Sequence, residues 1–125
     1  MMINHGMNAT IRTYTTYLLK IVALGISYYA AAQIGLRWAT VGEQVTLIWF
    51  PTGIALAVLF LFGSNLWLGV ALGALAVNLS THAPLLFLFA AVGNTLQAVT
   101  AVFFLRKLHF SPQIGRLSDV FALLI

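Results

Sequence analysis

The sequence predicts an all-α, polytopic transmembrane helical bundle with four complete spans and the start of a fifth. Composition is the first reason: hydrophobic residues make up 62% of the 125 positions and charged residues 6%, whereas soluble domains carry roughly 25% charged residues. Spacing is the second reason. The apolar residues fall in blocks of about 20, which is the length of α-helix that crosses about 30 Å of hydrocarbon.

The first span follows a polar segment, Met1 to Thr16, which we expect to lie in the cytoplasm. The apolar block behind this segment is too long for a signal peptide and lacks a small-residue cleavage site, so we expect it to be retained. Lys20 lies near the start of the span, where its long side chain can reach the interface. Arg37 closes the span.

Short polar connections separate the later spans. Gly63-Ser64-Asn65 has turn chemistry and ends the second span. Pro84 separates the third span from the fourth, because a proline pushes the preceding residue out of helical geometry. The last apolar run, up to Ile125, is too short to cross a bilayer, which predicts either a truncated part of a longer protein or a half-inserted tail that needs a partner. The expected spans cover about residues 17–36, 46–62, 66–80 and 84–105, and the fifth begins near residue 120.

The basic residues predict the orientation. They lie at the ends of apolar blocks rather than along one face, so they indicate topology and not nucleic-acid binding. Arg37 alone falls in the first connection. The N-terminal part and the fourth connection carry the others, which places both in the cytoplasm: Arg12, Lys20, Arg106, Lys107 and Arg116.

The second span begins irregularly, because Pro51 closely follows Trp49. A proline within a helix frees carbonyls that the hydrocarbon cannot satisfy, so we expect another part of the bundle to approach it. On the fourth span, amides should face inward, since an amide facing lipid keeps unpaired groups. That face comprises Ala90, Asn94, Gln97, Ala98 and Ala101. The result would be a polar pocket for a ligand or signal in the outer half of the bundle, formed by Trp49, Pro51, Thr52, Asn78, Asn94 and Gln97. In the alternative interpretation, the same side chains only join helices through hydrogen bonds.

Small residues predict close helix packing. Gly69 and Gly73 form a GxxxG pair on the third span, and such pairs let helix backbones approach each other. Gly53 and Ala57 form a matching small pair on the second span. We therefore expect these two spans to pack through the two pairs.

Catalytic residues are not evident. Glu43 and Asp119 are the two carboxylates, and the predicted topology puts them on opposite sides of the membrane. The three histidines have no partner at metal-ligand spacing, and there is no cysteine. We expect neither catalysis, nor a metal, nor a cofactor within this chain.

A series of motifs resembles the MASE family, the first type of membrane-associated sensor domain of bacterial signalling proteins. The order and spacing of these motifs agree with the family over roughly residues 14 to 125. The motifs are Trp49-x-Pro51-x-Gly53-Ile54-Ala55-Leu56-Ala57, Gly63 with Trp67-x-Gly69 and Leu72-Gly73-Ala74, Asn78, Gly93-Asn94-Thr95, Leu105-Arg106, and Arg116-Leu117-x-Asp119-Val120.

The resemblance implies the N-terminal half of a multi-pass sensory input domain in the bacterial inner membrane, with a cytoplasmic N-terminus. It implies partners outside this sequence: the remaining spans and a cytoplasmic output domain of the diguanylate cyclase, phosphodiesterase or histidine kinase type. The lipid bilayer surrounds such a domain, and a homodimer is an open alternative. Two other functions also remain open, a fragment of a small transporter or channel and a helix-packing partner protein.

Overall fold

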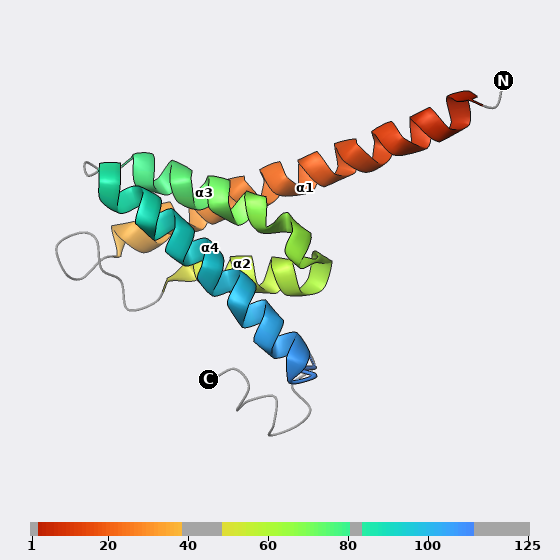
Figure 1. Ribbon diagram of the computed structural model, residues 1–125. Coiled ribbons are helices and arrows are strands. Elements are labelled where there is room, and N and C mark those ends of the chain that lie inside the picture. Colours follow the sequence, from red (N-terminus) through yellow and green to blue (C-terminus); the bar gives the residue numbers. More distant parts are fainter. Residues whose placement is uncertain (1–2, 39–48, 81–83, 112–125) are drawn as a thin grey trace.

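The computed structural model describes residues 3–38, 49–80 and 84–111, and helices make up nearly all of this part of the chain (Figure 1). The expected all-α class is confirmed. The expected fifth run, the start of the second span at 46 and the basic residue Arg116 lie outside the described residues. The helices are α1 (Ile3–Arg37), α2 (Phe50–Phe62), the 3₁₀ turn η1 (Ser64–Leu66), α3 (Trp67–Leu79) and α4 (Pro84–Lys107).

Helix length distinguishes two of the described helices from the other two. Helices α1 and α4 are long and apolar enough to cross a membrane. Helices α2 and α3 have 13 residues each, which corresponds to about 20 Å at the α-helical rise and is less than the hydrocarbon thickness. The lengths therefore support two full spans, and the expected set of four complete spans is not confirmed.

Helix α1 is longer than the span expected from the sequence, because it begins at Ile3 and includes the polar N-terminal segment. This polar part extends away from the other helices (Figure 1). Threonine is a weak helix former, but here its hydroxyls donate hydrogen bonds to carbonyls one turn earlier, as Thr13 does to Ala9 and Thr16 to Arg12. The polar segment is therefore an extension of the first helix.

The turn between α2 and α3 is tight, as expected from the sequence. Gly63 has φ +118°, a conformation that side-chain-bearing residues rarely adopt. Its N–H donates to the carbonyl of Leu59 at 3.2 Å, which caps the end of α2. The chain then reverses through η1 directly into α3.

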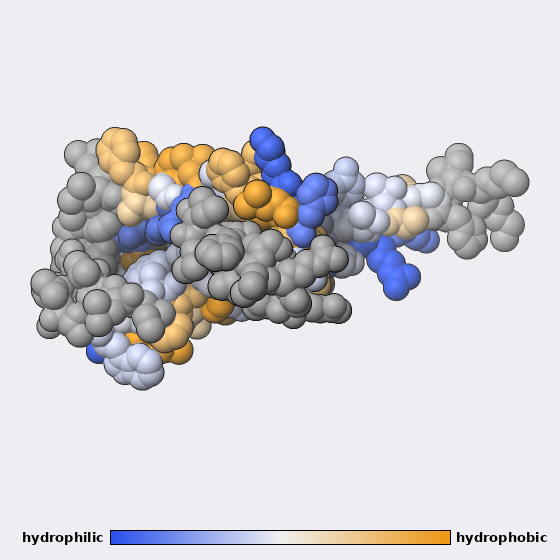
Figure 2. Space-filling model, turned by 90° about the horizontal axis from the view of Figure 1, so that it is seen from below, coloured by the Kyte–Doolittle hydropathy of each residue, from blue (hydrophilic) through white to orange (hydrophobic). Residues whose placement is uncertain are grey.

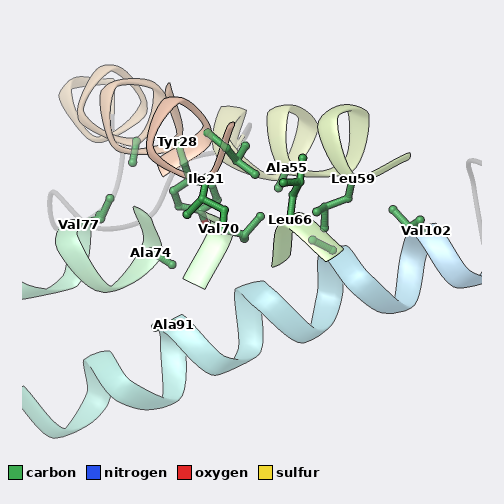
Figure 3. Close-up of a cluster of buried hydrophobic side chains, with 13 residues drawn as sticks. Ile21, Tyr28, Ala55, Leu59, Leu66, Val70, Ala74, Val77, Ala91 and Val102 are labelled. Atoms are coloured by element: carbon green, nitrogen blue, oxygen red, sulfur yellow. The ribbon is translucent and has the colours of Figure 1, made fainter. Parts of the chain in front are cut away.

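The buried core lies where α1, α3 and α4 meet around α2 (Figure 3). Tyr28 of α1, Leu59 of α2, Val70 of α3 and Val102 of α4 are among the largest fully buried side chains. On α4 the inward positions recur every three or four residues, which is the helical repeat of a single face. This core fixes the relative positions of all four helices.

The GxxxG pair of α3 packs against α1. A Cβ built on Gly69 would lie 2.9 Å from the carbonyl oxygen of Ile21, and one on Gly73 would lie 2.8 Å from Cβ of Tyr28. By contrast, a Cβ on Gly53 would meet nothing within 4 Å, and Ala57 is exposed. The GxxxG pair thus packs closely, and its partner is α1 rather than the expected second span. Residue spacing identifies the face that packs and does not identify its neighbour.

Apolar side chains also cover the outside of the bundle. Figure 2 shows hydrophobic residues over much of the visible face and hydrophilic residues where the α1 extension leaves it. Soluble monomers rarely expose large contiguous apolar patches. Every one of the four α-helices contributes large exposed apolar side chains, for example Leu19, Ile26, Leu61, Leu72, Phe89 and Phe103.

Candidate functional site

The irregular start of α2 is the first element of the candidate site. Helix α2 begins at Phe50, so Pro51 lies in its first turn. The first N–H groups of a helix have no intrahelical acceptor, and a proline there costs no hydrogen bond. The expectation that Pro51 frees carbonyls within a helix was therefore wrong. Pro51 instead fixes the start of α2 and is itself buried.

Two polar groups lie in the core beside this helix start. Tyr28 of α1 is 1% exposed, and the indole of Trp49, directly before α2, is the polar neighbour of its hydroxyl. The Tyr28 hydroxyl and Trp49 Nε1 do not reach hydrogen-bond geometry, and both atoms are buried without a hydrogen-bond partner among the described residues. Burial of an unsatisfied polar group typically costs about 1–3 kcal/mol. Tyr28 and Trp49 therefore bring two buried polar groups side by side in a largely apolar part of the core.

The same tyrosine also packs against α3. Its Cβ and Cδ1 atoms lie at 2.8 and 3.1 Å from the Cβ position of Gly73. On the other side of the pair, the ring of Trp49 lies 3.9 Å from the Cβ position of Gly35 on α1. Tyr28 thus connects the α1–α3 contact to the start of α2. We call Tyr28, Trp49 and Pro51 the aromatic site.

The remaining residues of the predicted pocket are more dispersed. Thr52, Asn78 and Asn94 are half-buried, and Gln97 is exposed. The inward face of α4 is formed by Ala91, Thr95, Ala98, Val102 and Leu105.

The expected inward face of α4 is therefore wrong at Gln97 and Ala90, which are exposed, and right at Ala98, which is buried. The physical reason is that small residues allow α4 to approach its neighbours closely, and the buried Thr95 and Ala98 lie one position after the amides Asn94 and Gln97. The buried hydroxyl of Thr95 donates to the carbonyl of Ala91 at 2.8 Å within its own helix. It consequently needs no partner on another helix.

Tyr28 is the site residue that sequence reasoning missed. A signal for it was available, because a tyrosine in the middle of an apolar span carries a hydroxyl that needs a partner. The neighbouring Tyr29 gives the same signal but is exposed. The contact of Tyr28 with Gly73 of α3, together with its burial, distinguishes the two.

Basic residues gather at the opposite end of the bundle, around the α2–α3 turn. The guanidinium of Arg106, near the end of α4, donates to the carbonyls of Leu59 and Phe60 at 3.2 and 3.3 Å. Lys20 of α1 lies 5.8 Å from the ring centroid of Phe62. Within the described residues, three or more His, Cys, Asp or Glu side chains do not gather at any point to form a metal site.

A comparison with known protein families shows to which family the chain belongs. The MASE1 family model matches residues 20–125. The chain belongs to the MASE1 family. MASE1 is a membrane-associated sensor domain of signalling proteins, which confirms the resemblance seen in the motifs and supports a sensory rather than a catalytic role for this segment.

The MASE1 chain is also similar to a curated protein of Escherichia coli (strain K12), the probable diguanylate cyclase DgcE. The two are 29% identical over 97 residues, which make up 73% of this chain and 9% of DgcE. This chain thus spans a small part of the relative's length. No solved structure matches the chain.

Proposed function

We propose that this chain forms the N-terminal half of a sensory input domain in the bacterial inner membrane. A stimulus in the outer half of the bundle would alter the packing of the aromatic site, and a cytoplasmic output domain of the same protein would respond. Membership of the MASE1 family and similarity to a probable diguanylate cyclase support a place in a signalling protein, and the proposed output is of the cyclase, phosphodiesterase or histidine kinase type.

The observation that carries this proposal is the buried Tyr28–Trp49 pair. Both polar atoms are buried and neither has a hydrogen-bond partner of good geometry among the described residues, so a change in packing that improves their hydrogen bonding would be favourable. A domain with two packings of similar free energy responds to a ligand that binds one of them better. The pair lies where α1, α2 and α3 meet, so a change in its packing would affect the contacts of three helices.

The clustered basic residues support the proposed orientation. Lys20 and Arg106 both contact the end of α2, and Lys107 follows at the end of α4. Arg37 lies at the other end of α1. Since basic residues favour the cytoplasmic side, we place the α2–α3 turn in the cytoplasm and the aromatic site toward the outer surface. All four α-helices then cross or enter the membrane in alternating directions, with α2 and α3 shorter than the bilayer core.

A chimera tests the sensory role. Residues 20–125 would replace the matching segment of DgcE, and cyclic di-GMP would be measured in cells. Tyr28→Phe removes the buried hydroxyl, and a shift of about 1 kcal/mol in the balance between two packings changes their ratio about fivefold. We expect basal output to change by about that factor.

Tyr29→Phe is the matched control, because this neighbouring hydroxyl is on an exposed residue. Output from this variant should equal that of the unsubstituted chimera. Equal output from both variants, at equal amounts of membrane-inserted protein, would refute a role of the aromatic site in signalling. Solute flux through the purified chain in proteoliposomes would instead favour the transporter alternative.

A further inference from the structure

A cavity of about 390 Å³ lies between α1 and the α2–α3 turn. Arg12 and Lys20 line it from α1, and Phe62 and Leu66 line it from the other side. We call this cavity the Arg12–Lys20 pocket. It lies at the opposite end of the bundle from the aromatic site and is therefore separate from the proposed sensing site.

The charge of the pocket selects an anion. Arg12, Thr16 and Lys20 follow each other at intervals of four residues, which places them along one face of α1. The two basic residues are about 12 Å apart along the helix, and their long side chains border the same cavity. Arginine and lysine together are typical ligands of a phosphate group.

The position of the pocket along α1 selects the kind of phosphate. Thr13 and Thr16 line the pocket at its polar end, while large exposed apolar side chains follow at Leu18 and Leu19. The pocket therefore lies where the surface of α1 changes from polar to apolar, which is the depth of lipid headgroups in a bilayer.

The wall of the pocket also fits a lipid. Phe62 is 62% exposed, and the Nζ atom of Lys20 lies over its ring at 5.8 Å from the centroid. A lipid would place its charged headgroup against the basic residues and its acyl chain against Phe62 and the apolar face of α1. A soluble phosphate ester would use the basic residues alone and leave the aromatic wall in contact with water.

We propose that the Arg12–Lys20 pocket binds the phosphate group of an anionic phospholipid. The inference uses the membrane location of the MASE1 family and does not depend on the nature of the stimulus or of the output. It assigns the basic end of α1 a ligand in addition to its effect on topology.

Native mass spectrometry of the purified 125-residue chain tests this site. The chain in detergent would be titrated with phosphatidylglycerol and, separately, with zwitterionic phosphatidylcholine of the same acyl chains. We expect clear preference for phosphatidylglycerol. The double substitution Arg12→Gln with Lys20→Gln should weaken binding of phosphatidylglycerol by about thirtyfold, as expected for the loss of two basic side chains at an anionic lipid surface.

The matched control is Arg37→Gln with Lys107→Gln, which removes the same amount of charge outside the pocket. This control should bind phosphatidylglycerol like the unsubstituted chain, and so should Arg12→Lys with Lys20→Arg, which retains both charges. Circular dichroism checks that every variant keeps its helix content. Equal weakening in both charge-removing variants, or equal binding of the two lipids by the unsubstituted chain, would overturn the proposal. Displacement of the lipid by soluble glycerol phosphate at similar concentration would also overturn it, because the ligand would then be a soluble phosphate.

Discussion

Substitution of Gly73 by alanine is expected to destabilise the bundle, although alanine is the better helix former. A Cβ at this position would lie 2.8 Å from Cβ of Tyr28 and 3.0 Å from the carbonyl oxygen of Gly25. Carbon atoms pack best at about 3.5–4.0 Å, so the new methyl group is too close by about 0.7–1.2 Å. Neither neighbouring atom is at the end of a flexible side chain, and therefore α1 and α3 must move apart.

The magnitude follows from a matched comparison with Gly93. This glycine lies within α4, and a Cβ built on it meets nothing within 4 Å. Both substitutions gain about 1 kcal/mol of helix propensity, and this gain cancels in the comparison. The difference between them is the cost of overpacking, typically about 1–3 kcal/mol. We expect Gly73→Ala to be less stable than Gly93→Ala by this amount.

Equilibrium unfolding of the purified chain by sodium dodecyl sulfate in mixed micelles, followed by circular dichroism, measures this difference. Gly25→Ala is a useful third variant, because its Cβ would make an ordinary contact of 3.4 Å with the carbonyl oxygen of Gly69. It should unfold close to Gly93→Ala. If Gly73→Ala were as stable as Gly93→Ala, α1 and α3 would not pack through the GxxxG pair, and the reasoning would fail.

Three further substitutions have expected effects in the same unfolding assay. Tyr28→Phe should stabilise the chain by about 1 kcal/mol, because it removes a buried hydroxyl without a hydrogen-bond partner among the described residues. Tyr29→Phe, at an exposed residue, should have no effect. A loss of stability in Tyr28→Phe would mean that the Tyr28 hydroxyl has a hydrogen-bond partner. Arg106→Gln should lower the free energy of unfolding by about 1–2 kcal/mol, because the guanidinium donates to two carbonyls at the end of α2. The neighbouring substitution Lys107→Gln is the control. Equal effects of the two substitutions would argue against the Arg106 hydrogen bonds. His109→Gly should stabilise the end of α4 by about 0.5–1 kcal/mol, because His109 has φ +54°, a conformation in which glycine has no steric cost. Unchanged stability would indicate that contacts of the histidine side chain offset the steric cost of this conformation.

Local features of the fold were predictable where one residue type is needed for a physical reason. Gly63 ends α2 because the turn requires a positive φ, and turn residues in the sequence marked this position. The GxxxG pair was predictable because glycines on one helix face allow close approach. The identity of the facing helix was not predictable, because several apolar helices present similar surfaces.

The errors at the candidate site have a common cause. Pro51 was expected within a helix, but the structural effect of a proline depends on its distance from the helix start, and apolar composition does not define that start. Gln97 was expected to face inward because amides avoid lipid, yet it is exposed, whereas Ala91, Thr95 and Ala98 of the same helix are buried. In both cases the prediction used the properties of one residue. The positions of the residues depend instead on where the helix begins and which face of the helix packs.

The aromatic site and the basic end of the bundle are connected by a single helix. Tyr28 contacts the glycine face of α3 and neighbours Trp49, while Lys20 and Arg12 lie toward the N-terminus of the same α1. Pro51 costs no hydrogen bond in the first turn of α2, so the feature of this region that a change in packing would alter is the buried Tyr28–Trp49 pair rather than a broken helix. A repacking that moves Tyr28 would also change its contact with Gly73, because Cβ of Tyr28 lies 2.8 Å from the Cβ position of Gly73. Because α1 is one continuous helix, such a movement would displace its Arg12 end, about 24 Å from Tyr28. Helix α1 would in this way transmit the proposed outer stimulus to the cytoplasmic side.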